Sequence, residues 1–238
     1  VLCRQLGHLL QVLFIATAYI VNEHKHKYIS IKIMKDHSYI STYIHSWGGC
    51  RSVALTENNA DVMLNKRCDY AGKLTDAMYD TLHQLYEARA YINDMHITEK
   101  GAWTIIADDT GVIWKNIPTS LETTLRRWIN NCELFQSVTF NDRGRWAIVS
   151  QQHFTASDND ILSWLNQDLA QYGKLYTVYM TDDAMVAVYS NGYKFSGNVP
   201  QKLQDALEEE TNDVYTVKFA GSSWFYADEH GDYCRFLL

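Results

Sequence analysis

One pattern of apolar residues recurs about every forty positions along the 238 residues of this chain. Each copy has alternating apolar residues, then a polar turn, then a second and more continuous apolar run. The first apolar residues of five copies are Val53, Met95, Val138, Val178 and Val217. Their successive spacings are 42, 43, 40 and 39 residues. A fixed period of this length is typical of stacked structural repeats, so it limits the possible folds more than any other feature of the chain.

A further copy is predicted near the N-terminus. Residues 12–28 align without a gap with residues 217–233, and the distance from Val12 to Val53 is 41 residues. The apolar run 9–21 also has the form of a signal-peptide core, with Arg4 ahead of it and Ala16-Thr17-Ala18 as a cleavage site. The alignment favours strands of a first repeat unit, and the signal peptide stays open as the alternative.

Each unit is predicted to contain three strands and one helix. The first strand alternates apolar and polar residues, and Asn191-Gly192 is a strong signal for the hairpin between the second and third strands. A helix follows, with Pro118 in its first turn and Thr119 and Glu122 at capping-box spacing. Apolar stripes at helical spacing are Met78/Leu82/Leu85, Leu121/Leu125/Trp128, Leu162/Leu165/Leu169 and Leu203/Leu207.

The fold class predicted is α+β: six tandem units, each a three-stranded antiparallel meander plus one helix. They form a single repeat domain over residues 1–238, with units starting near 12, 53, 95, 138, 178 and 217. Residues 1–11 have the spacing of a helix tail, and the last unit stops where other units begin their helix. Such complementary ends are expected of a propeller-like toroid that is closed by both termini. A section of an open solenoid is equally compatible with the sequence.

The composition of the chain limits the classes of partner that it can bind. The formal net charge is −7 and the pI is about 5.7, so the basic surface that nucleic-acid binding needs is absent, and an anionic membrane is disfavoured. Five cysteines without metal-ligand spacing favour a cytoplasmic location slightly, while secretion stays open.

No catalytic or cofactor motif is recognisable, and we expect neither a cofactor nor a metal site. The His-x-His pair at 24–26 lacks further ligands, and the acidic turns match turn preferences better than calcium loops. The enzymatic alternative is a Cys/His centre in a central pocket, as in the pentein amidinotransferases and deiminases, with Cys234, His230 and His153 as candidates. The glycine-rich surroundings and guanidine-binding acids of those enzymes are not recognisable here.

Aromatic residues on the third strands are the candidate binding residues. The set comprises Tyr28, Tyr70, Trp114, Tyr193 and Tyr233. Facing a common groove they would stack on sugars or peptide side chains, but their recurrence at one place in every unit suits packing between units better.

One motif resembles that of poorly characterised bacterial proteins built from tandem repeats of about 40 residues. It is formed here by Gly101/Trp103, Gly111, Ile117-Pro118 and Leu121. The second match lies at Asn191-Gly192, Val199-Pro200 and Leu203. The resemblance implies a repeat architecture and no particular activity. We therefore expect a non-catalytic scaffold that recognises a protein or a glycan.

Overall fold

The computed structural model of this chain describes residues 52–57, 61–64, 70–73, 75–108, 110–228 and 234–237. The unit predicted to start near Val12, the helix tail at 1–11, Tyr28 and Tyr233 lie outside these residues. The sixth unit and the single domain spanning 1–238 therefore stay predictions.

The described strands form five three-stranded antiparallel sheets, and each sheet is a meander of consecutive strands. The sheets are β1 (Ser52–Leu55), β2 (Asp61–Leu64) and β3 (Tyr70–Lys73); β4 (Ile92–Ile97), β5 (Trp103–Ala107) and β6 (Gly111–Lys115); β7 (Phe135–Phe140), β8 (Trp146–Ser150) and β9 (Phe154–Ala156); β10 (Leu175–Met180), β11 (Ala184–Tyr189) and β12 (Gly192–Gly197); and β13 (Val214–Ala220), β14 (Ser223–Asp228) and β15 (Cys234–Leu237).

The sheets share two features at equivalent positions. The five apolar residues that defined the sequence period each lie in the first strand of a sheet. A register shift also recurs near the start of that strand in four sheets, between Ile92 and Asp94, Phe135 and Ser137, Leu175 and Thr177, and Val214 and Thr216. Such an irregularity bends the strand at the same place in each unit.

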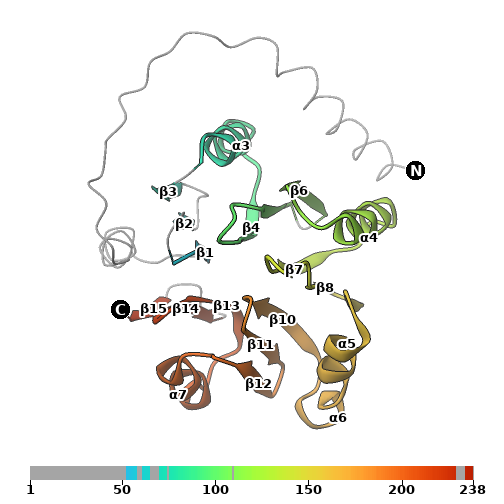
Figure 1. Cartoon of the computed structure of the whole chain (residues 1–238), viewed down its shortest axis with the longest axis vertical. Helices are drawn as coiled ribbons and strands as arrows, with labels where there is room; N and C mark the ends of the chain where they lie inside the picture. The colour runs from blue at the N-terminus through green and yellow to red at the C-terminus, as the bar shows by residue number, and fades with distance from the viewer. Residues whose placement is uncertain are drawn as a thin grey trace.

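The five sheets are arranged around a common centre, with the helices on the outside (Figure 1). The first strands contact one another in the order β1, β4, β7, β10 and β13, and β13 also contacts β1. We refer to these five strands as the strand circuit.

Helices connect successive sheets: α3 (Asp76–Glu87), α4 (Thr119–Asn130), α5 (Asn159–Asn166) with the short α6 (Leu169–Tyr172), and α7 (Gln201–Glu209). The predicted stripes of α3, α4 and α7 are buried. In α5 the stripe was misplaced, because Ile161 and Leu165 are buried and Leu162 is not. Among the described helices, no apolar stretch is long enough to span a bilayer.

The core consists of layers between successive sheets. In one layer, Leu125 of α4 and Ile106 of β5 pack with Val138 and Phe140 of the next sheet. The layers with α3, α5 and α7 repeat this arrangement around Met95, Val178 and Val217. These four residues of the first strands thus face back towards the preceding helix.

The hairpin predicted between the second and third strands of the fourth sheet is confirmed, but its turn lies one residue earlier than predicted. Tyr189 pairs with Gly192, so the turn is formed by Ser190 and Asn191, and Gly192 begins β12. A Cβ atom at Gly192 would lie 2.6 Å from the Tyr172 ring, which explains the glycine by close approach. The capping box predicted at Thr119 and Glu122 was wrong. Pro118 is the N-cap of α4 and makes no side-chain cap bond, and Glu122 pairs with Arg126 at 2.7 Å.

Candidate functional site

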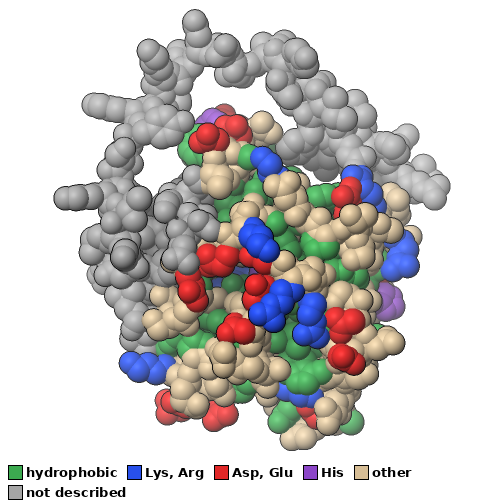
Figure 2. All heavy atoms as spheres, in the orientation of Figure 1, with side chains coloured by type: hydrophobic (Ala, Val, Ile, Leu, Met, Phe, Trp, Pro, Cys, Tyr) green, Lys and Arg blue, Asp and Glu red, His purple; other side chains and the backbone are tan. Residues whose placement is uncertain are grey.

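A cavity of about 280 Å³ lies where the strand circuit ends in its hairpin turns. All five first strands or the turns after them contribute to its lining. In Figure 2, acidic and basic side chains gather near the centre of one face of the molecule. The cavity has four levels of equivalent residues, which we describe from the surface inwards.

The mouth residues stand four positions after the period-defining residues: Glu57, Glu99, Asp142, Asp182 and Gly221. Three of the carboxylates accept a hydrogen bond from a backbone N–H of the preceding turn. Glu57 N donates to Glu99 Oε1, Lys100 N to Asp142 Oδ2 at 3.1 Å, and Asp142 N to Asp182 Oδ1 at 2.9 Å. The carboxylates therefore link one turn to the next around the mouth.

The level below the mouth comprises Thr56, Thr98, Asn141, Thr181 and Ala220. Asn141 Nδ2 donates to Thr181 O at 3.1 Å, and Thr181 Oγ1 donates to Asp183 Oδ1 at 3.0 Å. Thr98 differs: it is 6% exposed, and its Oγ1 has no hydrogen-bond partner within the described part of the chain. A buried hydroxyl without a partner costs free energy unless water or a ligand satisfies it.

The third level is apolar and comprises Leu55, Ile97, Phe140, Met180 and Phe219, one residue from each first strand. All five are buried. This level forms a low-dielectric floor under the polar mouth, and a low dielectric strengthens interactions between charges above it.

The deepest level contains one unlike residue from each first strand: Ala54, His96, Thr139, Tyr179 and Lys218. Of these, His96 and Tyr179 line the cavity. The side chains of His96, Thr139 and Tyr179 point forward, towards the next strand of the circuit. Thr139 Oγ1 accepts from Met180 N at 3.0 Å, and Tyr179 OH donates to Phe219 O at 3.1 Å. We call these five residues the forward residues.

His96 is buried and neutral. Burial, followed by the charge of Lys218, lowers the pKa of its imidazole to about 3, although the hydrogen bond to Phe140 O opposes this. Nε2 lies 2.6 Å from Phe140 O, and Nδ1 lies 3.4 Å from Thr139 Oγ1. Since a carbonyl only accepts, the proton of the neutral ring is assigned to Nε2, and Thr139 donates to Nδ1.

Lys218 reaches across the centre of the circuit. Its Nζ donates to Asp94 Oδ2 at 2.8 Å and to Met95 O at 2.9 Å, and Ser52 Oγ donates to Asp94 Oδ1 at 2.8 Å. Lys218 belongs to β13 and Asp94 to β4, so the ion pair passes β1, whose forward residue is the small Ala54. Lys218 is 3% exposed and Asp94 5%, so both charges depend on this pairing.

Tyr179 joins the buried network from β10. Its ring lies 5.3 Å from the His96 ring and 5.1 Å from the Phe219 ring, and Lys218 Nζ lies 5.2 Å from its centroid. Burial, followed by the charges of Asp94 and Glu99, raises the pKa of its hydroxyl well above the usual range. It is therefore a neutral hydrogen-bond donor in this setting.

The aromatic candidates from the sequence are not part of this cavity. Trp114 packs against the layer around α4, and Arg126 lies 5.1 Å from its ring. Tyr193 lines a different hollow of about 410 Å³ between the fourth and fifth sheets, where burial and then Glu210 and Asp213 raise its pKa to about 12. Tyr70 lies in β3, the third strand of its sheet. Their role as binding residues stays a prediction.

The residues of the enzymatic alternative are not brought together at the centre. Cys234 lies in β15, the third strand of its sheet, and pairs with Ala227 of β14. His153 Nε2 lies 3.8 Å from Glu133 Oε1, with the His153 side chain 62% exposed. His230 lies outside the described residues.

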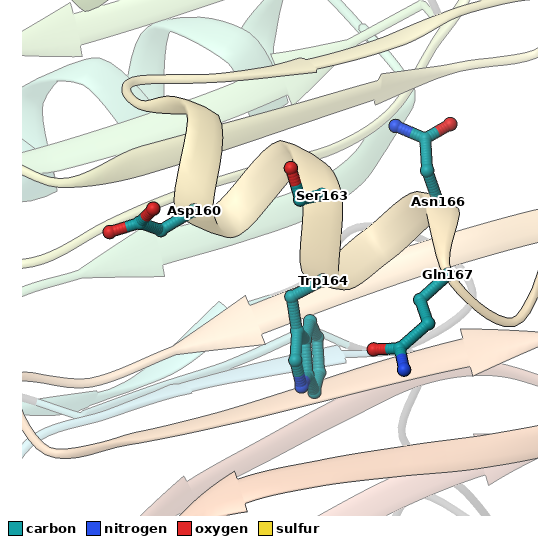
Figure 3. Close-up of a pocket in the computed structure, with 5 residues that line it drawn as sticks. All are labelled: Asp160, Ser163, Trp164, Asn166 and Gln167. Atoms are coloured by element: carbon teal, nitrogen blue, oxygen red, sulfur yellow. The ribbon is translucent and has the colours of Figure 1, made fainter.

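A surface hollow at α5 is lined by Asp160, Ser163, Trp164, Asn166 and Gln167. Figure 3 shows Ser163 and Asn166 pointing to the opposite side of the helix from Trp164 and Gln167. The side chains do not converge on a common point.

Within the described part of the chain, no group of three or more His, Cys, Asp and Glu side chains could hold a metal ion.

No protein-family model matches this chain. No curated protein sequence matches it either. One of the solved structures that match this chain is described as YCF48 bound to D1 peptide, with a TM-score of 0.34 and 11% sequence identity. The match covers 76% of this chain and 62% of that chain.

Proposed function

We propose that this chain is a non-catalytic, toroidal repeat scaffold that recognises a partner protein with the face on which the central cavity opens. Contact between β13 and β1 supports a toroid, because an open arc would separate its first and last sheets. The observation that carries the function is the polar mouth, to which the turns of all five described sheets contribute.

The distribution of residues separates recognition from architecture. Apolar residues recur at the period-defining positions, and carboxylates recur at four of the five mouth positions, whereas the forward residues differ from sheet to sheet. The forward residues His96, Thr139, Tyr179 and Lys218 bond to other strands of the circuit, so they are occupied within the fold. The mouth remains the accessible polar surface.

The size and charge of the cavity favour a protein ligand over a glycan or a nucleic acid. At about 280 Å³ it lies just below the roughly 300–1,000 Å³ range of pockets for drug-sized ligands, and is small for a sugar chain. Carboxylates at the mouth repel phosphates. A single side chain of a larger protein fits, with the surrounding face as the contact area.

Comparative capture tests this proposal. The mouth variant combines Glu99→Gln, Asp142→Asn and Asp182→Asn, whose amide oxygens still accept the turn hydrogen bonds. The outer control combines Asp80→Asn, Glu87→Gln and Glu209→Gln, which are exposed on α3 and α7. Both change the net charge equally.

Wild type, the mouth variant and the outer control are immobilised and exposed to extract from the organism that encodes the chain, with quantitative mass spectrometry as the readout. We expect a protein bound by wild type and the outer control and lost from the mouth variant. Equal capture by all three would overturn the proposal, as would strong binding of wild type to a glycan array with no mouth-dependent protein.

A further inference from the structure

A second hollow lies between the fourth and fifth sheets and shares no lining residue with the central cavity. Its volume is about 410 Å³, which falls within the roughly 300–1,000 Å³ of sites for small ligands. It is lined by α6, by the hairpin between β11 and β12, and by the segment that leads from α7 into β13. It is therefore an independent candidate for a ligand site.

One wall of this hollow departs from the repeat. Helices α3 and α4 are followed by a left-handed residue, Arg89 at φ 54° and Cys132 at φ 57°, after which a backbone N–H bonds back to the helix. Glu210 at the end of α7 is extended instead, with φ −73° and ψ 133°. Its carboxylate accepts hydrogen bonds from the N–H groups of the next two residues and from Tyr226 OH, at 2.8–3.2 Å. Residues 210–213 thus form a wall that the fold itself holds in place.

A second wall carries aromatic rings. Tyr193 and Phe195 lie on one face of β12, with ring centroids 6.5 Å apart and ring planes at 16° to each other. Both line the hollow and are half-buried, so part of each ring is open to a ligand. The counterpart of Tyr193 in the second sheet is Val112: in both sheets this residue pairs with the one that follows the partner of the period-defining residue. Tyr193 therefore adds a ring where the second sheet has a buried aliphatic side chain.

Polar side chains border these rings from two sides. Asn191 belongs to the hairpin, whereas Glu208 and Asp213 belong to the segment around the end of α7, and all three are exposed. Burial, followed by the charges of Glu210 and Asp213, raises the pKa of the Tyr193 hydroxyl to about 12. At neutral pH this hydroxyl keeps its proton, so it can both donate and accept a hydrogen bond.

The charges of the hollow exclude acidic ligands. No Lys, Arg or His side chain lines it within the part of the chain that the structure describes, so a phosphate, sulfate or carboxylate group would meet carboxylates alone. A wholly apolar ligand would leave the polar border without partners. The ligand that fits both the rings and their border has a flat C–H face and several hydroxyl groups.

We infer that this hollow binds one neutral sugar ring of a glycan. The C–H face of the sugar stacks on Tyr193 and Phe195, and its hydroxyl groups donate to the oxygen atoms of Asn191, Glu208 and Asp213. Protein recognition, as proposed above, uses the face of the central cavity, so the two sites are independent.

The test uses the full-length chain, a glycan array and NMR titrations with the methyl glycosides of glucose, galactose, mannose and N-acetylglucosamine. We expect at least one neutral glycoside to bind with a Kd on the order of 1 mM, as a small ligand of this size would. Its affinity should change little with salt, because no charges are neutralised. Methyl glucuronide, which carries a carboxylate, should bind more weakly, and choline is the cationic comparison.

Variants locate the sugar in the hollow. Tyr193→Val introduces the residue of the second sheet and should weaken binding about fivefold or more, through loss of the stacking ring. Because Tyr193 also packs against the core, a second variant combines the exposed changes Glu208→Ala and Asp213→Ala. It should weaken binding severalfold and leave the midpoint of thermal unfolding unchanged. The control of equal charge, Asp80→Ala with Glu209→Ala, should bind as wild type does.

Any of three results would refute the inference: no neutral sugar binds, choline binds where the sugars do not, or Tyr193→Val and the Glu208/Asp213 variant both bind sugar like wild type. The mouth variant separates this inference from the proposed function. It should lose the partner protein and keep the sugar. Loss of the sugar from the mouth variant, with retention by both hollow variants, would place the sugar in the central cavity and also refute the inference.

Discussion

The two faces of the strand circuit follow different rules although they belong to the same strands. Residues that face back towards the preceding helix are alike: Met95, Val138, Val178 and Val217 fill equivalent places in successive layers. The forward residues one position later are all different and mostly polar. A strand places successive side chains on opposite faces, so one register serves both roles.

The difference shows how a repeated fold acquires a defined order. Apolar contacts are non-directional, so equivalent layers could pack against one another in many combinations. Hydrogen bonds such as that from His96 to Phe140 O, and the Lys218–Asp94 pair between β13 and β4, each need one particular partner. We infer that the backward face supplies most of the stability and that the forward face specifies which sheets are neighbours.

The most damaging change we expect is Asp94→Ala on the forward face. It leaves Lys218 buried without a counter-charge, and such a loss costs about 3–5 kcal/mol. Urea unfolding followed by circular dichroism measures it. Asp94→Leu with Lys218→Met removes both charges and should recover most of the loss. A double variant no more stable than Asp94→Ala would show that the pair stabilises the fold by more than mutual neutralisation.

A slightly smaller effect is expected on the backward face. Met95 is 1% exposed, and Met95→Ala should lower the free energy of unfolding by about 2–5 kcal/mol through lost burial and a cavity. Met95→Leu conserves volume and is the control, with an expected cost below about 1.5 kcal/mol. The same urea experiment compares the two. If Met95→Ala were almost neutral, the backward face would not be the main source of stability.

Acid should weaken the forward face selectively through His96. Its pKa is about 3 in the folded chain and 6.5 ordinarily, so below pH 6.5 the unfolded state binds a proton that the folded state excludes. Stability is therefore full above pH 6.5 and declines as pH falls towards 3. The decline between pH 7 and 4.5 should be roughly 2–3 kcal/mol.

Chemical unfolding at several pH values tests this, with His96→Gln as the variant without a titrating ring. The variant should lose most of the slope between pH 6.5 and 4.5. The pKa values of the Asp158 and Asp183 carboxyls are lowered from 3.8, so their contributions disappear only at lower pH and do not obscure this window. An unchanged slope in His96→Gln would assign the acid sensitivity to other groups.

Thr139→Val probes a single forward hydrogen bond. The variant keeps the shape but leaves Met180 N–H and His96 Nδ1 without the hydroxyl, at a cost of about 1–3 kcal/mol. Thr139→Ser retains the hydroxyl and should recover most of that stability. Thermal and urea unfolding of the pair decide it; equal stability of Val and Ser variants would mean that water replaces the hydroxyl.

The two faces also differ in how far the sequence could predict them. Periodicity alone located Met95 and Val138 and the buried helix positions Leu125 and Leu203, because burial of one face imposes a period. It misplaced the α5 stripe by one residue, at Leu162 instead of Ile161, where neighbouring apolar residues made two registers possible.

The candidate site was missed for a physical reason. His96 and Lys218 stand where the repeat pattern is irregular, and an irregular position resembles an exposed one until the neighbouring strand is known. Lys218 and Asp94 are 124 positions apart, and their pairing depends on β13 lying against β1, which no local spacing reports. Alignment of the five units offered one signal: the residue after each period-defining position changes character at every repeat.

The smallest effect is expected where the forward linkage reaches solvent. Asp142→Ala removes the acceptor of Lys100 N at the mouth, yet the hydrogen bond is exposed, so the loss of stability should stay below about 1 kcal/mol. Asp142→Asn keeps an acceptor and is the control. The denaturant midpoints of both variants are measured together with that of Thr139→Val. Their comparison shows how the loss of stability changes from the mouth of the cavity to its centre. A loss equal to that of Thr139→Val would make the mouth carboxylates structural; a small loss leaves them available for a ligand.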